Sequence, residues 1–176
     1  MSFDYQPVLM GELVELRPLR SEDYDDLYAV AADPLIWEQH PVKNRHEEVV
    51  FQEFFRQAVA SGSALVAIDA RTQSVIGSSR FHGYNLRKSE VEIGWTFLAR
   101  SHWDSTYNGE VKRLMLQHAF RFVDGVVFLI GAQNLRSQRA VEKIGGRRVG
   151  SRPDGDGRDN YVYLITASDE LSHNAP

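Results

Sequence analysis

The sequence contains no cysteine among its 176 residues. Disulfide bonds, thiolate nucleophiles and cysteine-ligated zinc are therefore excluded. The six histidines are scattered along the chain and no two stand four residues apart on a predicted helix, so we expect no metal site. Because a chain without cysteine suits a reducing compartment, we expect a cytoplasmic protein.

Long hydrophobic runs and long basic runs are also missing. No stretch approaches the roughly 20 apolar residues that cross a membrane, and residues 1–11 lack the pattern of a signal peptide, so we expect no membrane partner. The net charge is −4 and lysine and arginine never occur in runs longer than two. Since nucleic-acid-binding domains usually carry a basic face, the sequence argues against nucleic acid as the main partner.

The residues that are present have the composition of a globular domain, with 43% hydrophobic and 25% charged side chains. A chain of this length corresponds to one domain on the prior of roughly 100–200 residues per domain. We therefore predict a single domain over residues 1–176, with its core at about 11–166 and a polar tail at 168–176.

Hydrophobic periodicity predicts an alternation of strands and helices. Ser21 is the predicted N-cap of the first helix and Gly62 the residue that ends the second. The expected strands are 13–17, 64–68, 75–82, 90–98, 126–130, 148–151 and 161–165, and the expected helices are 21–33, 46–61, 107–123 and 134–144.

The order of these elements predicts an α/β fold with a mixed sheet. The strand, helix and strand between residues 91 and 130 form a βαβ unit, which should be right-handed. The earlier strands follow one another through short turns, which favours antiparallel pairing. We expect helices on both faces of the sheet.

The junction between the strand at 90–98 and the helix at 107–123 is the most informative segment. A loop of small and polar residues that enters a helix presents unpaired backbone N–H groups at the positive end of the helix dipole, which suits a diphosphate. Neither the Walker A motif nor the dinucleotide glycine fingerprint is present. This junction alone does not identify a ligand.

Three segments in this order resemble the GNAT superfamily of N-acyltransferases, in particular its branch similar to the ribosomal-protein-alanine N-acetyltransferases. The resemblance covers residues 11–166. It is carried by Val-Glu-Ile-Gly-Trp-Thr-Phe-Leu at 91–98, Trp-Asp-Ser-Thr-Tyr-Asn-Gly-Glu at 103–110, and Asn-Leu-Arg-Ser at 134–137 ahead of Gly145 and Gly146. It implies a mixed sheet flanked by helices and the co-substrate acetyl-CoA.

The resemblance also implies a role for individual residues. The backbone of Phe97 and Leu98 would pair with pantetheine, and the Leu98 N–H would polarise the thioester carbonyl. Arg100 would open the diphosphate loop, and Arg139 would reach the nucleotide. Asn134 and Ser137 would lie near the pantetheine and the sulfur, and the loop around the diphosphate would comprise Trp103, Asp104, Ser105, Thr106, Tyr107 and Asn108.

The implied reaction is direct attack of a neutral amine on the thioester, which requires a base, an oxyanion donor and a proton for the thiolate. Glu92 is the candidate for a base that acts through water; the alternative is a solvated or salt-bridged strand glutamate. Ser137 is the candidate for thiolate protonation; the alternative is a cap of the following helix. His118 lies on an apolar stripe and is interpreted as a core residue.

The sequence departs from the family pattern at two places. Val141 occupies the position at which many members have a tyrosine acid, and Asp104 and Thr106 replace loop glycines. An acyl-CoA-binding module with little turnover is therefore the alternative to an enzyme. The acceptor is left open between a peptide N-terminus and a small-molecule amine, with the loop at 37–41 expected to expose groups that contact it. A homodimer is also left open.

Overall fold

The computed structural model describes residues 2–103, 105–153 and 157–169. It contains one sheet of eight strands in the order β1-β2-β3-β4-β5-β6-β8-β7. The strands are β1 (Leu9–Met10), β2 (Val14–Pro18), β3 (Ala64–Asp69), β4 (Val75–Asn85), β5 (Glu90–Leu98), β6 (Gly125–Gly131), β7 (Arg147–Pro153) and β8 (Asp159–Thr166). The helices are α1 (Tyr24–Ala31), α2 (Glu48–Ala60), α3 (Ser105–Ala119) and α4 (Leu135–Lys143), and short 3-10 turns are η1 (Ser21–Asp23), η2 (Pro34–Ile36) and η3 (Arg100–His102).

The predicted α/β fold with a mixed sheet is confirmed. Strands β1 to β5 run antiparallel to their neighbours, β5 and β6 are parallel, and β6, β8 and β7 are again antiparallel. The one parallel pair is joined through α3, because a parallel connection must cross from one end of the sheet to the other.

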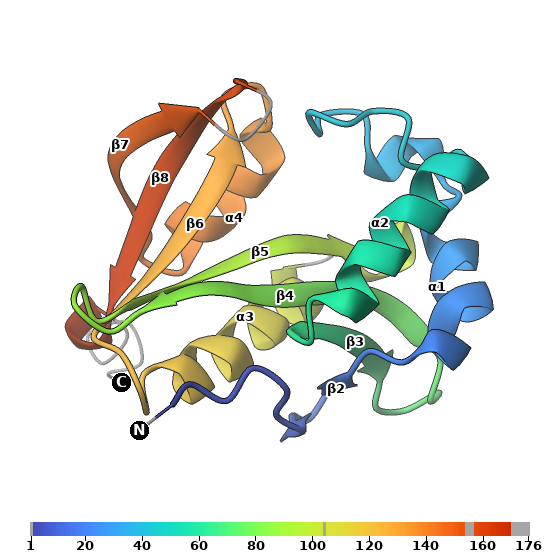
Figure 1. Cartoon of the computed structure of the whole chain (residues 1–176). Helices are drawn as coiled ribbons and strands as arrows, with labels where there is room; N and C mark the ends of the chain where they lie inside the picture. The colour runs from blue at the N-terminus through green and yellow to red at the C-terminus, as the bar shows by residue number, and fades with distance from the viewer. Residues whose placement is uncertain (1, 104, 154–156, 170–176) are drawn as a thin grey trace.

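Helices cover both faces of the sheet (Figure 1). On one face, α1 and α2 enclose a core built around Leu27, Phe51 and Val66. On the other face, α3 and α4 pack over a larger core that includes Met115 and Val141. Both faces of the central strands are therefore buried, which explains the unbroken apolar run in β3, where every residue is buried.

Local caps shift several predicted boundaries. The backbone at Arg20, with its extended angles, precedes η1, so Ser21 is not the N-cap. α3 begins at Ser105 and ends at Ala119, earlier at both ends than predicted. Gly62 has a φ of +61°, the conformation expected of a glycine that ends a helix. The short strand β1 was not predicted, since two residues carry no readable period.

A buried carboxylate fixes the first turn of the sheet to α3. The carboxylate of Glu110 accepts the backbone N–H groups of Glu12, Leu13 and Val14, at donor–acceptor distances between 2.7 and 3.1 Å. This contact anchors the helix whose N-terminus faces the candidate site.

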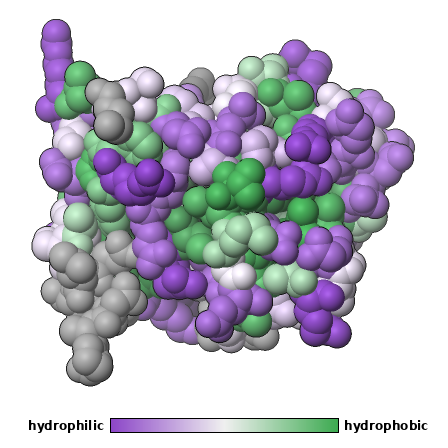
Figure 2. Space-filling model, turned by 90° about the horizontal axis from the view of Figure 1, so that it is seen from below, coloured by the Kyte–Doolittle hydropathy of each residue, from purple (hydrophilic) through white to green (hydrophobic). Residues whose placement is uncertain are grey.

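On the underside of the molecule as drawn in Figure 1, an apolar area is bordered by hydrophilic side chains (Figure 2).

No helix within the described residues is long and apolar enough to span a membrane.

Candidate active site

The parallel strands β5 and β6 diverge after three residue pairs. The pairs are Glu90 with Gly125, Val91 with Val126, and Glu92 with Val127. Beyond them β5 stays with β4, whereas β6 stays with β8 and turns away with it (Figure 1). Backbone groups on the facing edges of the two strands lose their sheet partners there, and Glu92 stands at the point where the strands separate.

A bulge in β5 lies beside this opening. Between the pairs Arg80 with Gly94 and Ser78 with Phe97, β5 has one residue more than β4. Trp95 lies in the bulge with a φ of +53°, an uncommon backbone conformation for an aromatic residue. Bulges redirect the side chains that follow and are frequent next to active sites.

The Leu98 N–H is directed to the open edge of β5. The neighbouring Ala99 N–H donates to the Ile76 carbonyl on β4 at 2.7 Å, and adjacent residues of a strand direct their N–H groups to opposite edges. The Leu98 carbonyl also lies on the open edge, where it accepts the indole N–H of Trp103 at 2.8 Å. This geometry leaves the Leu98 N–H available as a donor, but commits its carbonyl to Trp103.

The loop after β5 is held by two acidic residues outside it. The Arg100 guanidinium forms an ion pair with Asp33, which holds the pKa of Asp33 below its usual range. The buried Asp69 carboxylate accepts from His102 Nε2 at 3.0 Å and from the Tyr107 hydroxyl at 3.3 Å. The charge of Arg100 is therefore directed to Asp33, and the Tyr107 side chain is directed to β3.

The remaining loop residues are placed only in part. Asp104 lies outside the described residues, so the prediction that it lines the diphosphate loop stays a prediction. The backbone of Ser105 opens α3, Thr106 is exposed and Asn108 is half-buried. α3 therefore begins two residues after Trp103, and the prediction that its N-terminus binds a diphosphate stays a prediction.

Asn134 and Ser137, the two residues predicted to act at the start of α4, have different positions in the structure. Asn134 is the N-cap, since its side-chain Oδ1 accepts the Ser137 N–H at 3.2 Å. The alternative interpretation of Ser137 as the cap is therefore wrong. Ser137 is half-buried and Arg139 is exposed, which leaves both side chains free of a capping role.

Arg136 was not singled out from the sequence, yet it joins three segments around the site. Its guanidinium carbon lies 3.9 Å from the centroid of the Trp103 ring and its Nη2 donates to the Ile36 carbonyl at 3.1 Å. Its backbone N–H donates to the Gln39 side chain. Only the fold brings these segments together, so no sequence pattern identifies this residue.

The position of the family's tyrosine acid is a core position in this protein. Val141 is 1% exposed, and a side chain added at Gly146 would meet its Cγ1 at 2.3 Å. The turn at Gly146 therefore packs directly against Val141, and no hydroxyl group is supplied from this position.

The environment of Glu92 suits an acid–base group. Burial raises the pKa of Glu92, while the charge of Arg152 partly opposes this effect. Its cross-strand neighbours are His82 on β4 and Val127 on β6. A carboxylate with a raised pKa at the separation of two strands is a candidate proton acceptor.

Within the loop at 37–41, Trp37 differs from the prediction that its side chain is exposed, whereas Glu38 and Pro41 are exposed. Trp37 is 2% exposed and packs 5.0 Å, centroid to centroid, from Phe97, so it belongs to the core and not to an exposed acceptor surface. Its indole N–H donates to the backbone carbonyl of Ala31 at the end of α1.

His118 is a core residue, as predicted. Its Nε2 is hydrogen-bonded to the backbone carbonyl of Asp4.

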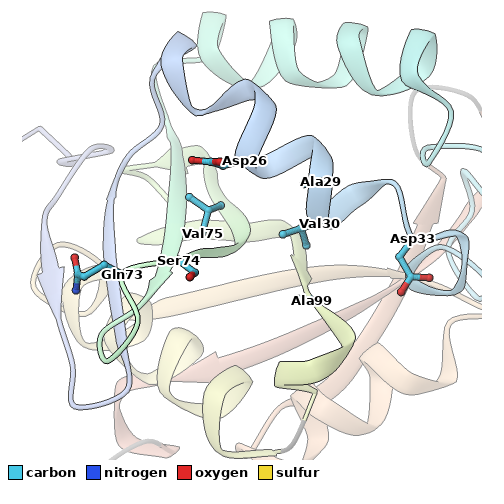
Figure 3. Close-up of a pocket in the computed structure, with 8 residues that line it drawn as sticks. All are labelled: Asp26, Ala29, Val30, Asp33, Gln73, Ser74, Val75 and Ala99. Atoms are coloured by element: carbon cyan, nitrogen blue, oxygen red, sulfur yellow. The ribbon is translucent and has the colours of Figure 1, made fainter.

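A shallow pocket lies elsewhere, between α1, the start of β4 and Ala99 (Figure 3). Asp26 and Asp33 are among its lining residues, and these carboxylates would repel a diphosphate. Its lining includes none of the residues predicted for the active site.

In the part of the chain that the structure describes, no group of three or more histidine or acidic side chains could hold a metal ion.

An open strand edge beside a helix N-terminus is an arrangement that can accommodate an extended, anionic ligand. The model of the acetyltransferase (GNAT) domain matches residues 14–147. The chain belongs to this family, as its sequence predicted. No protein of curated function matches the chain.

Solved structures share the fold at low sequence identity. A GCN5-related N-acetyltransferase from Brucella melitensis is 19% identical, with 97% of this chain and 86% of that chain covered and a TM-score of 0.83. A Vibrio cholerae protein assigned as a ribosomal-protein-serine acetyltransferase is 14% identical, with coverages of 94% and 99% and a TM-score of 0.70. Spermidine N-acetyltransferase from Vibrio cholerae, in complex with CoA and spermine, is 15% identical, with coverages of 92% and 99% and a TM-score of 0.66.

Proposed function

We propose that this protein transfers an acetyl group from acetyl-CoA to a primary amine of a peptide N-terminus or a small molecule. The observation that carries the proposal is the Leu98 N–H at the open edge of β5, next to the N-terminus of α3. An N–H donor without a strand partner can bind a thioester carbonyl, and the helix N-terminus behind it can bind a diphosphate.

The residues around the opening would bind acetyl-CoA along its length. Phe97 and Leu98 would contact the pantetheine through the backbone. The amides from Trp103 to Asn108 would surround the diphosphate, Asn134 would lie beside the pantetheine, and Arg139 would contact the nucleotide. The co-substrate supplies an activated acetyl group; the protein supplies orientation, an oxyanion donor and proton transfer.

The reaction forms a C–N bond and breaks the C–S bond. Glu92 would accept the amine proton through a water molecule, and the Leu98 N–H would stabilise the oxyanion that develops. The departing thiolate requires a proton, for which Ser137 is the candidate because Asn134, and not Ser137, caps α4. A main-chain amine with a pKa of about 7.7–8.0 would need less help than a lysine with a pKa of about 10.4.

A second function, acyl-CoA binding with little turnover, is favoured by one observation. Val141 is sealed in the core, so the hydroxyl acid common in the family is missing from that position. The two functions differ in whether a thiol is released when an amine is present.

The test combines calorimetric titration of CoA with an assay of thiol release from acetyl-CoA over a panel of peptides, amino acids and other amines. Amine-dependent thiol release supports the enzyme. Binding of CoA without release on any acceptor supports the binding module, and absence of CoA binding overturns both.

A further inference from the structure

Two arginine side chains on the α2 face of β4 and β5 have no carboxylate partner in the described part of the chain. Arg80 on β4 is 8% exposed, and Arg45, in the loop that precedes α2, is half-buried. The Nε atoms of both residues are buried and have no hydrogen-bond partner. Across the described ranges, neither guanidinium takes part in a salt bridge.

Aromatic rings surround these two guanidinium groups. The guanidinium carbon of Arg80 lies 4.5 Å from the centroid of the Trp95 ring and 5.8 Å from that of Phe54. The corresponding carbon of Arg45 lies 4.5 Å from the Phe54 centroid and 5.3 Å from that of Trp37. Rings attract the cation through their faces, but they offer no acceptor to the N–H groups at the guanidinium edge. The polar side-chain neighbour of the Arg45 guanidinium is His40, whose Nε2 lies 3.4 Å from Arg45 Nη1.

The arrangement is electrostatically incomplete. Burial lowers the pKa of Arg80, and burial together with the charges of Arg80 and Arg158 lowers the pKa of Arg45 to about 10. A buried charge without a partner is strongly destabilising, and planar guanidinium groups match carboxylates with two parallel hydrogen bonds. An anion between these residues would satisfy both the charges and the two unpaired Nε–H groups.

The cluster stands beside the proposed base. On the β4–β5 ladder, His82 pairs with Glu92 and Arg80 pairs with Gly94, two residues further along each strand. Residues two apart share a face of the sheet and are separated by roughly 7 Å. The Trp95 ring contacts a residue of each pair. It lies next to the Arg80 guanidinium, and it also packs edge-on against His82, with 5.4 Å between the ring centroids.

From this placement we infer that the amine acceptor carries a carboxylate within a few bonds of its amine, and that Arg45 and Arg80 bind this carboxylate. The inference rests on the proposed acetyl transfer and narrows its acceptor to amino acids and similar molecules. The amine would then lie toward Glu92 while the carboxylate lies toward Arg80. A polyamine would bring positive charge to two unneutralised arginines and is disfavoured.

The first test compares α-amino acids with their amides, with spermidine as a cationic control, in the thiol-release assay. The amide keeps the side chain and the amine but lacks the negative charge. We expect kcat/KM to be roughly ten- to hundredfold higher for the amino acids, the range for losing a hydrogen bond to a charged group. Equal or better acetylation of the amides or of spermidine would overturn the inference while leaving acetyl transfer intact.

The second test uses Arg80→Met and Arg45→Met, with Arg56→Met as the control because Arg56 is exposed on α2 and pairs with Glu53. We expect both cluster variants, and not the control, to lose the preference for amino acids while KM for acetyl-CoA stays constant. In Arg80→Met, removal of a buried charge without an ion-pair partner should also raise the melting temperature. A preference retained in both cluster variants would overturn the inference.

Calorimetric titration of the same α-amino acids into the wild type and into Arg45→Met, in the presence of CoA, separates the two proposals. Binding that the substitution abolishes supports the carboxylate site even if no acceptor is turned over, in which case acetyl transfer is the proposal that fails. If no amino acid binds, the carboxylate site is refuted.

Discussion

The guanidinium carbon of Arg136 on α4 lies 3.9 Å from the centroid of the Trp103 ring, whose indole N–H donates to the Leu98 carbonyl. This stack connects the two sides of the opening between β5 and β6. Arg136 follows β6 and Trp103 follows β5, so the stack joins the segments after these two strands next to the start of α3, where the diphosphate loop is proposed. The stack therefore helps to set the position of the proposed acetyl-CoA loop.

Replacing Trp103 with phenylalanine keeps a ring for Arg136 but removes the donor to Leu98. Loss of this hydrogen bond is worth about 1 kcal/mol, so we expect KM for acetyl-CoA to rise roughly fivefold with little change in KM for the amine. Arg136→Lys serves as the companion, since it keeps the charge and loses the planar group. Steady-state kinetics check both; unchanged KM in Trp103→Phe would show that the indole N–H does not position the loop.

Glu92→Gln should lower kcat by about 10²- to 10⁴-fold, the usual contribution of a general base, without changing CoA affinity. Burial raises the pKa of Glu92, so activity of the wild type should fall with decreasing pH at a higher pH than an ordinary glutamate would produce. Because Arg152 favours the ionised form, Arg152→Gln should move this fall to still higher pH. A pH profile of kcat/KM that is the same in Glu92→Gln and wild type would remove Glu92 from the mechanism.

Because Asn134 caps α4 and Ser137 does not, substitutions at these two residues should have different effects. We expect Ser137→Ala to lower kcat more than it raises KM, because an interaction with the departing thiolate strengthens in the transition state, and to leave stability unchanged. Asn134→Ala removes the Oδ1 that caps α4 and should cost about 1 kcal/mol of unfolding free energy. Kinetics and denaturant unfolding on the same two variants decide this; normal kinetics in Ser137→Ala would contradict its catalytic role.

Asp69 should make stability depend on pH in the acid range. Hydrogen bonds, above all from His102, lower the pKa of Asp69 to about 2, although burial opposes this. The stabilisation is therefore complete above the unfolded pKa of about 3.9 and is lost as pH falls toward 2, a change of roughly 2 kcal/mol. Denaturant titrations between pH 2 and 5 should show this loss in wild type and a flatter dependence in Asp69→Asn.

Lys112 should also make stability rise with pH, but in the alkaline range. Its buried ammonium lies 5.4 Å from the centroid of the Phe128 ring, and burial lowers its pKa from 10.5 to about 8. Between these values the unfolded chain binds a proton that the folded protein does not, so stability rises with pH, by on the order of 3 kcal/mol in total. Lys112→Met should be more stable than wild type at pH 7 and should lack the rise, which unfolding measurements from pH 7 to 10.5 will show.

The sequence by itself determined the class of fold and the location of the junction at which the co-substrate loop is proposed. The period-two pattern of β5, the apolar runs of β3 and β6 and the stripe of α3 are local signals, so the order of elements could be derived from them. The junction of β5 with α3 was found in the same way, and Glu92 followed from its place on the polar side of β5.

Only the tertiary structure decided which distant residues meet. The bulge at Trp95, the separation of β6 from β5 and the stack of Arg136 on Trp103 depend on strand register and packing, which no local pattern encodes. Trp37 was expected on the surface but fills the core, because the loop around it folds back on Phe97. Arg45 and Arg80 are 35 residues apart in sequence and share the ring of Phe54 only because α2 lies across β4 and β5.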